Sequence, residues 1–163
     1  MADDFPRRWV GPHFKAEQLE RERRRRRKTR LELELTSKRQ VRDEDRFCRF
    51  PLCGCDRERL PWEVAHLRHK GMGGNPTGDR SAPELLIYLC SARHRTSAIS
   101  LHAGTLHVEP LSAVLGTRGP CAFSVRLDDA WIEVGRERDD LHDFEEFTPE
   151  QRRILLDLAC LTC

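Results

Sequence analysis

Histidine side chains are concentrated in the middle of the chain, where they could carry out metal or proton-transfer chemistry. Five of the seven histidines lie between His66 and His107, a stretch of 42 residues that includes a glycine-rich segment. Imidazole binds divalent metals and exchanges protons near neutral pH. One histidine is usually a structural residue, but five in so short a stretch predict a functional site.

Cysteines flank the same stretch. The chain has seven of them: Cys48, Cys53, Cys55, Cys90, Cys121, Cys160 and Cys163. The odd number, and an N-terminus without the apolar run of a secretory signal, favour reduced thiols or metal ligands over a disulfide framework. Three cysteines fall within residues 48–55, which is too dense for ordinary core filling. The pair at residues 160 and 163 has no second pair nearby, and its C-x-x-C spacing is interpreted as a frayed helix end.

Short strands and two helices must position these residues. Residues 14–46 contain no Pro or Gly and are rich in Arg, Glu and Leu, which predicts a long helix. Strands are predicted for the runs WEVAHL (62–67), LLIYL (85–89), TLHVEPL (105–111), CAFSVRL (121–127) and AWIEV (130–134). Residues 71–81 predict an irregular loop, and a helix is predicted to begin in CSARHRTSA (90–98). Thr148 and Gln151 form a capping box that opens a C-terminal amphipathic helix.

Charge is distributed unevenly along the chain. Residues 1–40 hold 13 Lys or Arg against 7 Asp or Glu, whereas residues 128–163 hold 4 against 11. A basic front favours contact with a polyanion, although a solvated charged helix is the simpler alternative. No run approaches the roughly 18–20 apolar residues of a membrane helix, so we expect neither a membrane protein nor an exported one, but an intracellular, cytoplasmic protein.

Four ordered motifs between Asp43 and Pro110 resemble the HNH nucleases, a family built on a ββα-metal finger. They are RFCRFPLCGC, EVAHLRHKGMGG, PELLIYLCSARH and SLHAGTL. The form of the loop resembles phage-encoded or prophage members. The resemblance implies an α+β fold with the finger at its centre, a long basic N-terminal helix, extra short strands and a C-terminal helix. We expect a basic arm at 1–42, a nuclease core at 43–127 and an acidic segment at 128–163.

The resemblance implies a role for several histidines in metal-dependent hydrolysis of DNA phosphodiesters. His66 would be the general base that activates water, and His94 and His102 would bind Mg²⁺, Mn²⁺ or Zn²⁺. The family usually has a metal ligand directly before the base, where this chain has Ala65. Glu63 or His69 would replace it; strand alternation puts Glu63 on the face opposite His66, so His69 is the better substitute.

The resemblance also implies a structural zinc. The candidate ligands are Cys48, Cys53, Cys55 and Cys90, because Arg93 stands where a final C-x-x-C cysteine would be. Buried free thiols are the alternative. The family's middle Asn is replaced by Leu85, which together with Ala65 leaves a second function open: a catalytically inactive, zinc-stabilised nucleic-acid-binding module.

Basic side chains surround the histidines and would contact DNA phosphates rather than base edges. They are Arg68, Lys70, Arg80 and Arg95. The N-terminal arm would add backbone contacts. The arm or the acidic segment could instead dock a protein partner, which would make the chain a structural or interaction domain.

Overall fold

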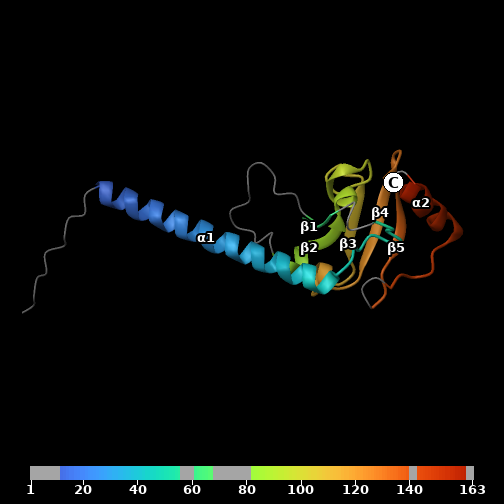
Figure 1. Cartoon of the computed structure of the whole chain (residues 1–163), viewed down its shortest axis with the longest axis horizontal. Helices are drawn as coiled ribbons and strands as arrows, with labels where there is room; N and C mark the ends of the chain where they lie inside the picture. Colours follow the sequence, from blue (N-terminus) through green and yellow to red (C-terminus); the bar gives the residue numbers. More distant parts are fainter. Residues whose placement is uncertain (1–11, 56–60, 68–81, 140–142, 161–163) are drawn as a thin grey trace, which may run out of the picture. The chain divides into compact units, whose positions relative to one another are not determined.

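The computed structural model describes residues 12–55, 61–67, 82–139 and 143–160, and it has the mixed α+β architecture predicted from the sequence (Figure 1). A long N-terminal helix, two small antiparallel sheets and a C-terminal helix make up these residues. Four of the predicted site residues, together with the predicted loop at 71–81, lie outside the described residues: Arg68, His69, Lys70 and Arg80. The chain divides into two units, Met1–Leu35 and Thr36–Cys163, each of which is described by itself.

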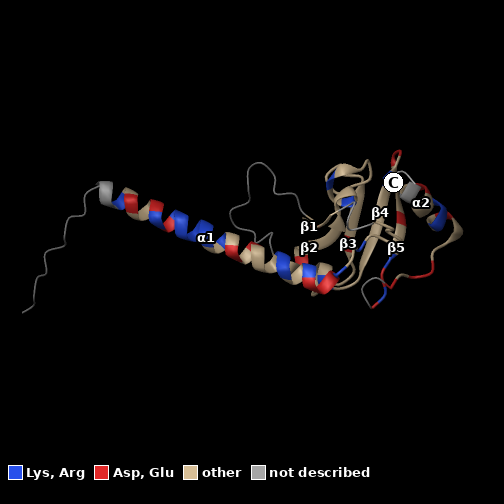
Figure 2. Ribbon diagram, viewed as in Figure 1, with Lys and Arg blue, Asp and Glu red and all other residues tan. Residues whose placement is uncertain are grey.

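Helix α1 (Pro12–Asp45) is the charged helix predicted for residues 14–46. All of its side chains from 15 to 33 are exposed, and cations predominate in its middle (Figure 2). Ion pairs one turn apart, such as Glu20 with Arg24, support such a helix without tertiary packing. The first unit ends within α1, at Leu35. None of the helices that the structure describes combines the length and the apolar character needed to span a membrane.

The last turns of α1 belong to the second unit and are anchored there. Val41 and Asp45 are buried, and Asp45 Oδ2 accepts a hydrogen bond of 3.2 Å from the backbone N–H of Tyr88. The helix ends where Arg46 adopts a left-handed conformation with φ 51°. The chain therefore turns directly from the buried end of α1 into the cysteine-containing segment.

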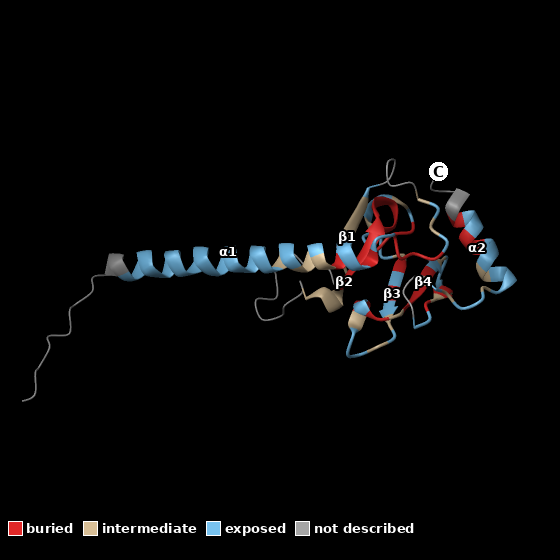
Figure 3. Cartoon of the chain, turned by 60° about the horizontal axis from the view of Figure 1, so that its bottom comes forward, coloured by how far each residue is buried: buried red, intermediate tan, exposed pale blue. Residues whose placement is uncertain are grey.

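The first sheet is a two-stranded antiparallel pair of β1 (Trp62–His66) and β2 (Leu86–Cys90). Cross-strand pairing places His66 opposite Leu86 and Glu63 opposite Leu89. Strand β2 is buried throughout, as its red colour in Figure 3 shows. Strand β2 lies between two short helical turns: η1 (Pro83–Leu85) leads into it, and η2 (Ala92–Thr96), a five-residue π-helix, follows it.

The second sheet contains β3 (Leu106–Pro110), β4 (Cys121–Leu127) and β5 (Ala130–Arg136), in that order and antiparallel. A 3₁₀ turn, η3 (Gly116–Arg118), precedes β4. The inward residues of β4 join Ile87, Leu89 and Cys90 of β2 in one core, so the two sheets enclose a common interior. All five strands lie where the sequence predicted strands.

Helix α2 (Pro149–Cys160) closes this core. The predicted capping box is confirmed: the Gln151 backbone N–H donates to Thr148 Oγ1 over 3.2 Å, and Gln151 Oε1 accepts from the Thr148 N–H over 2.8 Å. Ile154, Leu155 and Leu158 are buried in the core. Because β5 and α2 both come from residues 128–163, this acidic segment is an integral part of the second unit.

Candidate metal centre and histidine site

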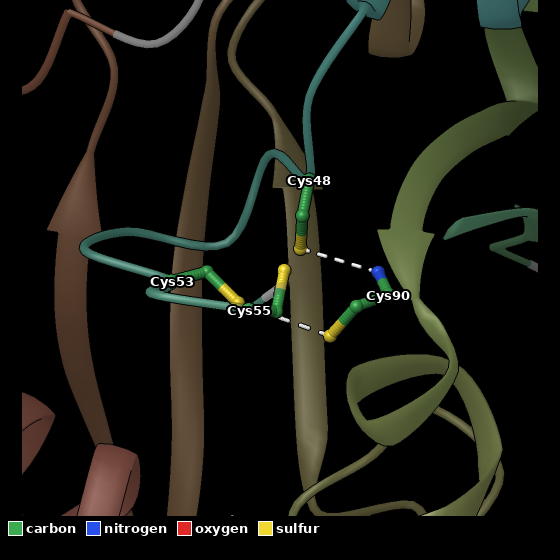
Figure 4. Close-up of side chains that lie close together, drawn as sticks. All are labelled: Cys48, Cys53, Cys55 and Cys90. Carbon is green, nitrogen blue, oxygen red and sulfur yellow. Dashed lines mark hydrogen bonds between the residues drawn. The ribbon is translucent and has the colours of Figure 1, made fainter. Parts of the chain in front are cut away.

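Four cysteines from two separate parts of the chain meet at one point in the second unit (Figure 4). Cys48, Cys53 and Cys55 come from the segment after α1, and Cys90 is the last residue of β2. Their Sγ atoms all lie within 4.8 Å of one another. Among the residues that the structure describes, this is the one group of three or more Cys, His, Asp or Glu side chains that could hold a metal ion.

The spacing of the sulfur atoms fits a tetrahedral metal better than a disulfide. Sγ of Cys53 and Sγ of Cys90 are 3.8 Å apart, and both cysteines are free. Four sulfurs at about 2.3 Å from a zinc ion would be about 3.8 Å from one another, whereas a disulfide joins sulfurs at about 2.05 Å. The backbone N–H of Cys90 also donates to Sγ of Cys48 over 3.2 Å, as outer partners of metal-bound thiolates do.

A buried ion pair holds the cysteine-containing segment in place. The Arg49 and Glu137 side chains are both fully buried, and two of the Arg49 guanidinium nitrogens donate to the Glu137 carboxylate. Arg49 also donates to the carbonyls of Thr117 and Gly119. Its backbone N–H bonds to Tyr88 O over 3.0 Å, which ties the segment to β2. These contacts fix Arg49, and they therefore also fix the adjacent residue, Cys48, within the cluster.

The thiols within the cluster share hydrogen bonds, and these favour a thiolate at Cys90. Hydrogen bonds from Cys48, Cys53 and Cys55, in that order of importance, hold the pKa of Cys90 well below its usual range, and a backbone hydrogen bond from Arg93 adds to this. The same network raises the pKa of Cys48. A thiolate is the form that binds a metal, so the cluster already favours ligation at one position.

Arg93 stands where the family resemblance would place the last cysteine of a C-x-x-C pair, and its side chain has a different role. The Arg93 side chain is buried; its Nη2 donates to Leu158 O near the end of α2 over 3.1 Å, and its guanidinium lies 4.6 Å from the ring centroid of Phe50. A cation at the end of a helix also interacts favourably with the helix dipole. Position 93 thus joins η2 to α2, while Cys55 completes the four-cysteine group.

A second group of side chains meets where β1 and η2 approach each other. Nδ1 of His94 and Oε2 of Glu63 are 2.6 Å apart, and Arg95 pairs with the other oxygen of the same carboxylate. The ring of His102 packs edge-on against His94, with centroids 4.7 Å apart. The backbone N–H of His102 also bonds to His94 O over 3.1 Å. Two of the predicted metal ligands, His94 and His102, are therefore adjacent.

Burial favours the neutral form of the His94 imidazole. The pKa of His94 is lowered from its usual value, chiefly because burial penalises the imidazolium, and the Glu63 carboxylate only partly opposes this. A neutral imidazole carries one N–H, and an ionised carboxylate can only accept a hydrogen bond. The proton is therefore on Nδ1, and Nε2 of His94 carries the lone pair that a metal requires.

His66 ends β1, as predicted for the general base, but it points away from the second group. Strand alternation puts it on the same face as Val64, which packs against Val41 of α1, and puts Glu63 on the other face. Its Nε2 atom is shielded from solvent. Of the predicted site residues, His94, His102 and Arg95 come together, whereas His66 lies on the opposite face of the β1–β2 pair.

Glu63 is the residue that sequence reasoning set aside in favour of His69. Strand alternation does separate Glu63 from His66, as predicted. The same alternation places Glu63 on the face of Ala65, the position at which the resemblance implies a metal ligand. Ala65 itself is fully buried in the core. Comparing Glu63 with Ala65 instead of with His66 would have predicted that the Glu63 side chain lies on this face.

Comparison of the chain with protein-family models, with curated protein sequences and with solved structures finds no match.

Proposed function

We propose that the protein is a metal-dependent endonuclease of the HNH type that hydrolyses DNA phosphodiesters. The observation that carries the proposal is the contact of Glu63 with His94, beside His102, at the junction of a β-hairpin and a short helix. The order of strand, strand and short helix, with a histidine at the end of the first strand and another in the helix, supports a ββα-metal finger like the one that the sequence resembles.

His94 and His102 would hold the metal, with Glu63 as a group that orients His94. The Glu63 carboxylate keeps the proton on Nδ1 of His94 and leaves Nε2 for the metal. When bound, a divalent ion would neutralise charge on the phosphoryl oxygens and on the leaving oxygen. Arg95, half exposed and paired with Glu63, lies beside these groups and is placed to contact a DNA phosphate.

His66 would accept the proton of the attacking water. An imidazole can exchange protons near neutral pH, which is what that role requires. In the described conformation its ring lies on the other face of β1 from His94. Binding of DNA would therefore have to be accompanied by a local rotation at the end of β1, next to the backbone hydrogen bond from the Leu67 N–H to Leu85 O.

The four-cysteine cluster would bind a structural zinc. It joins the segment after α1 to the end of β2, directly before η2, and so fixes the start of the turn that carries His94. A closed set of four thiolates leaves no open position for substrate, which is typical of structural zinc and not of catalytic zinc.

Plasmid nicking tests the proposal. The protein should convert supercoiled plasmid to open-circular or linear DNA with Mg²⁺ or Mn²⁺ and lose this activity in EDTA. His66→Ala should lower the rate by about 10²–10⁴-fold, the usual contribution of a general base, while DNA retention survives. His107→Ala is the matched control, since His107 is exposed on β3 and contacts Trp131 instead of the histidine pair.

A second function is favoured by two specific observations. Ala65 is buried where a family ligand would stand, and Nε2 of His66 is shielded from solvent. Both fit a catalytically inactive, zinc-stabilised module that binds nucleic acid. This alternative predicts salt-dependent DNA retention with no nicking under Mg²⁺, Mn²⁺ or Zn²⁺.

A further inference from the structure

The middle of α1 carries a block of positive charge that no other described part of the chain matches. Residues 21–30, here termed the basic segment, contain eight Lys or Arg residues and one Glu. They lie within the first unit, are helical throughout and are exposed at every position (Figure 3). The basic segment is therefore available to a partner along its whole length.

The cations of the basic segment point in all directions. Arg23 to Arg27 are consecutive, and successive residues of an α-helix are turned by about 100°. Five consecutive side chains thus surround the helix. A flat anionic surface, or a single phosphate backbone, could neutralise only the cations on one side and would leave the others unpaired.

From this geometry we propose that the basic segment lies in the major groove of duplex DNA. Only the choice of DNA as the partner rests on the proposed function. The groove is about 12 Å wide and about 8.5 Å deep, and it admits an α-helix of about 10–12 Å diameter. Phosphates line both of its walls, so a helix inside it meets negative charge on two sides. Ten residues rise about 15 Å, roughly the length over which a helix can follow the groove before it curves away.

Other occupants fit the basic segment less well. A membrane surface requires an apolar face, and the only exposed leucines of α1 in the described part of the first unit are Leu19, Leu31, Leu33 and Leu35, none of which lies within the basic segment. A parallel coiled coil with a second copy requires apolar residues at heptad positions, and none occurs there. Duplex RNA presents a deep, narrow major groove that is poorly accessible to a helix.

The test is the salt dependence of DNA binding by the full-length protein, measured in zinc-containing buffer without added magnesium. The variant replaces Arg23, Arg24, Arg25, Arg26 and Arg27 with Gln, which keeps helix propensity. The control replaces five exposed arginines elsewhere with Gln, for the same loss of charge: Arg39, Arg126, Arg138, Arg152 and Arg153. Circular dichroism establishes that both variants remain helical.

Groove binding predicts that the log–log salt slope of the variant is shallower by about 4, since each lost phosphate contact on duplex DNA contributes about 0.9. Contact from one side would remove only about half of these contacts and give about 2. The control should change the slope by less than 1. A second measurement uses duplex DNA whose cytosines carry bulky glucosyl groups in the major groove. The parent should bind it at least about tenfold more weakly than plain DNA, and the variant should bind both equally.

The proposal would be overturned by a slope change of 2 or less, by equal changes in variant and control, or by a parent protein indifferent to the glucosyl groups. Tighter binding to duplex RNA of the same length would also overturn it. Because no step involves cleavage, these outcomes are separate from the fate of the nuclease proposal. A protein that meets the binding predictions and never nicks plasmid would support groove binding and contradict the nuclease.

Discussion

Glu63 and His94, from β1 and η2, are in direct contact: Oε2 of the carboxylate lies 2.6 Å from Nδ1 of the imidazole. Both side chains are largely but not completely buried, with 22% and 13% of their surface exposed. The contact determines which ring nitrogen carries the proton. It therefore sets the direction in which His94 can offer its lone pair, and it links β1 to the metal-binding role proposed for η2.

Glu63→Gln should weaken metal binding by the histidine pair. The amide can hold Nδ1–H through its oxygen but cannot raise the basicity of the ring, and removal of such an outer partner typically costs about 10–100-fold in metal affinity. Direct Mn²⁺ binding, followed by electron paramagnetic resonance on zinc-loaded protein, measures this without relying on cleavage. Glu109→Gln on β3 is the control, and equal Mn²⁺ affinities in the two variants would show that Glu63 has no such role.

Cys55→Ala should remove the structural metal. We expect one zinc per chain in the parent and much less than one in the variant, because a three-thiolate site lacks the fourth ligand of a closed site. Losing several kcal/mol of folding free energy should lower the midpoint of thermal unfolding by about 10 °C or more. Cys121→Ala is the matched control: Cys121 is buried outside the cluster, where burial raises its thiol pKa to about 11, so this variant should keep its zinc.

Arg49→Met should destabilise the second unit by about 3–5 kcal/mol. The substitution leaves the Glu137 carboxylate buried without its cation, and breaking a buried pair costs far more than the pair contributes net. Denaturant unfolding measures the loss. The double variant Arg49→Met with Glu137→Leu should recover most of it, since no unpaired charge remains. A double variant as unstable as the single one would place the effect in packing instead.

Asp45 should make stability depend on pH between about 4 and 6. Burial raises its pKa from 3.8 to about 6, so the folded protein binds a proton that the unfolded chain releases over this interval. Stability from this group is therefore present below about pH 4 and is lost as the pH rises to about 6, by about 3 kcal/mol. Asp45→Asn removes that dependence. The free energy of unfolding of the variant minus that of the parent should be larger at pH 6.5 than at pH 4. The same difference at both pH values would contradict the assignment.

Local patterns in the sequence predicted the elements well because each pattern has a local physical cause. The capping box formed by Thr148 and Gln151 begins α2, and the charged run at 14–46 forms α1. Long-range contacts were harder to predict. The Arg49–Glu137 pair joins residues 88 positions apart, and no periodic pattern in the sequence predicts this contact. The sequence left two interpretations of the four cysteines, a zinc site or buried free thiols, and it could not show that their sulfur atoms meet. Nor could it show that the Arg93 side chain packs against α2.

The histidine site shows the same limit. The family resemblance implied His94 and His102 as metal ligands, and it left Glu63 as a candidate while favouring His69. The choice depends on how β1 faces η2, which is a tertiary relationship. His69, Arg68, Lys70 and Arg80 lie outside the described residues, so their roles remain predictions.

The most direct test of the account is the metal dependence of plasmid nicking by His94→Ala, compared with the parent and with His107→Ala. Titrations with Mn²⁺ and Mg²⁺ should show nicking by the parent and by the control over the same range of concentrations. His94→Ala should require far more metal or show no nicking at any concentration, because the ligand that Glu63 orients is gone. If the titration curves of His94→Ala and the parent coincide, His94 is a structural residue and the proposed metal site is wrong.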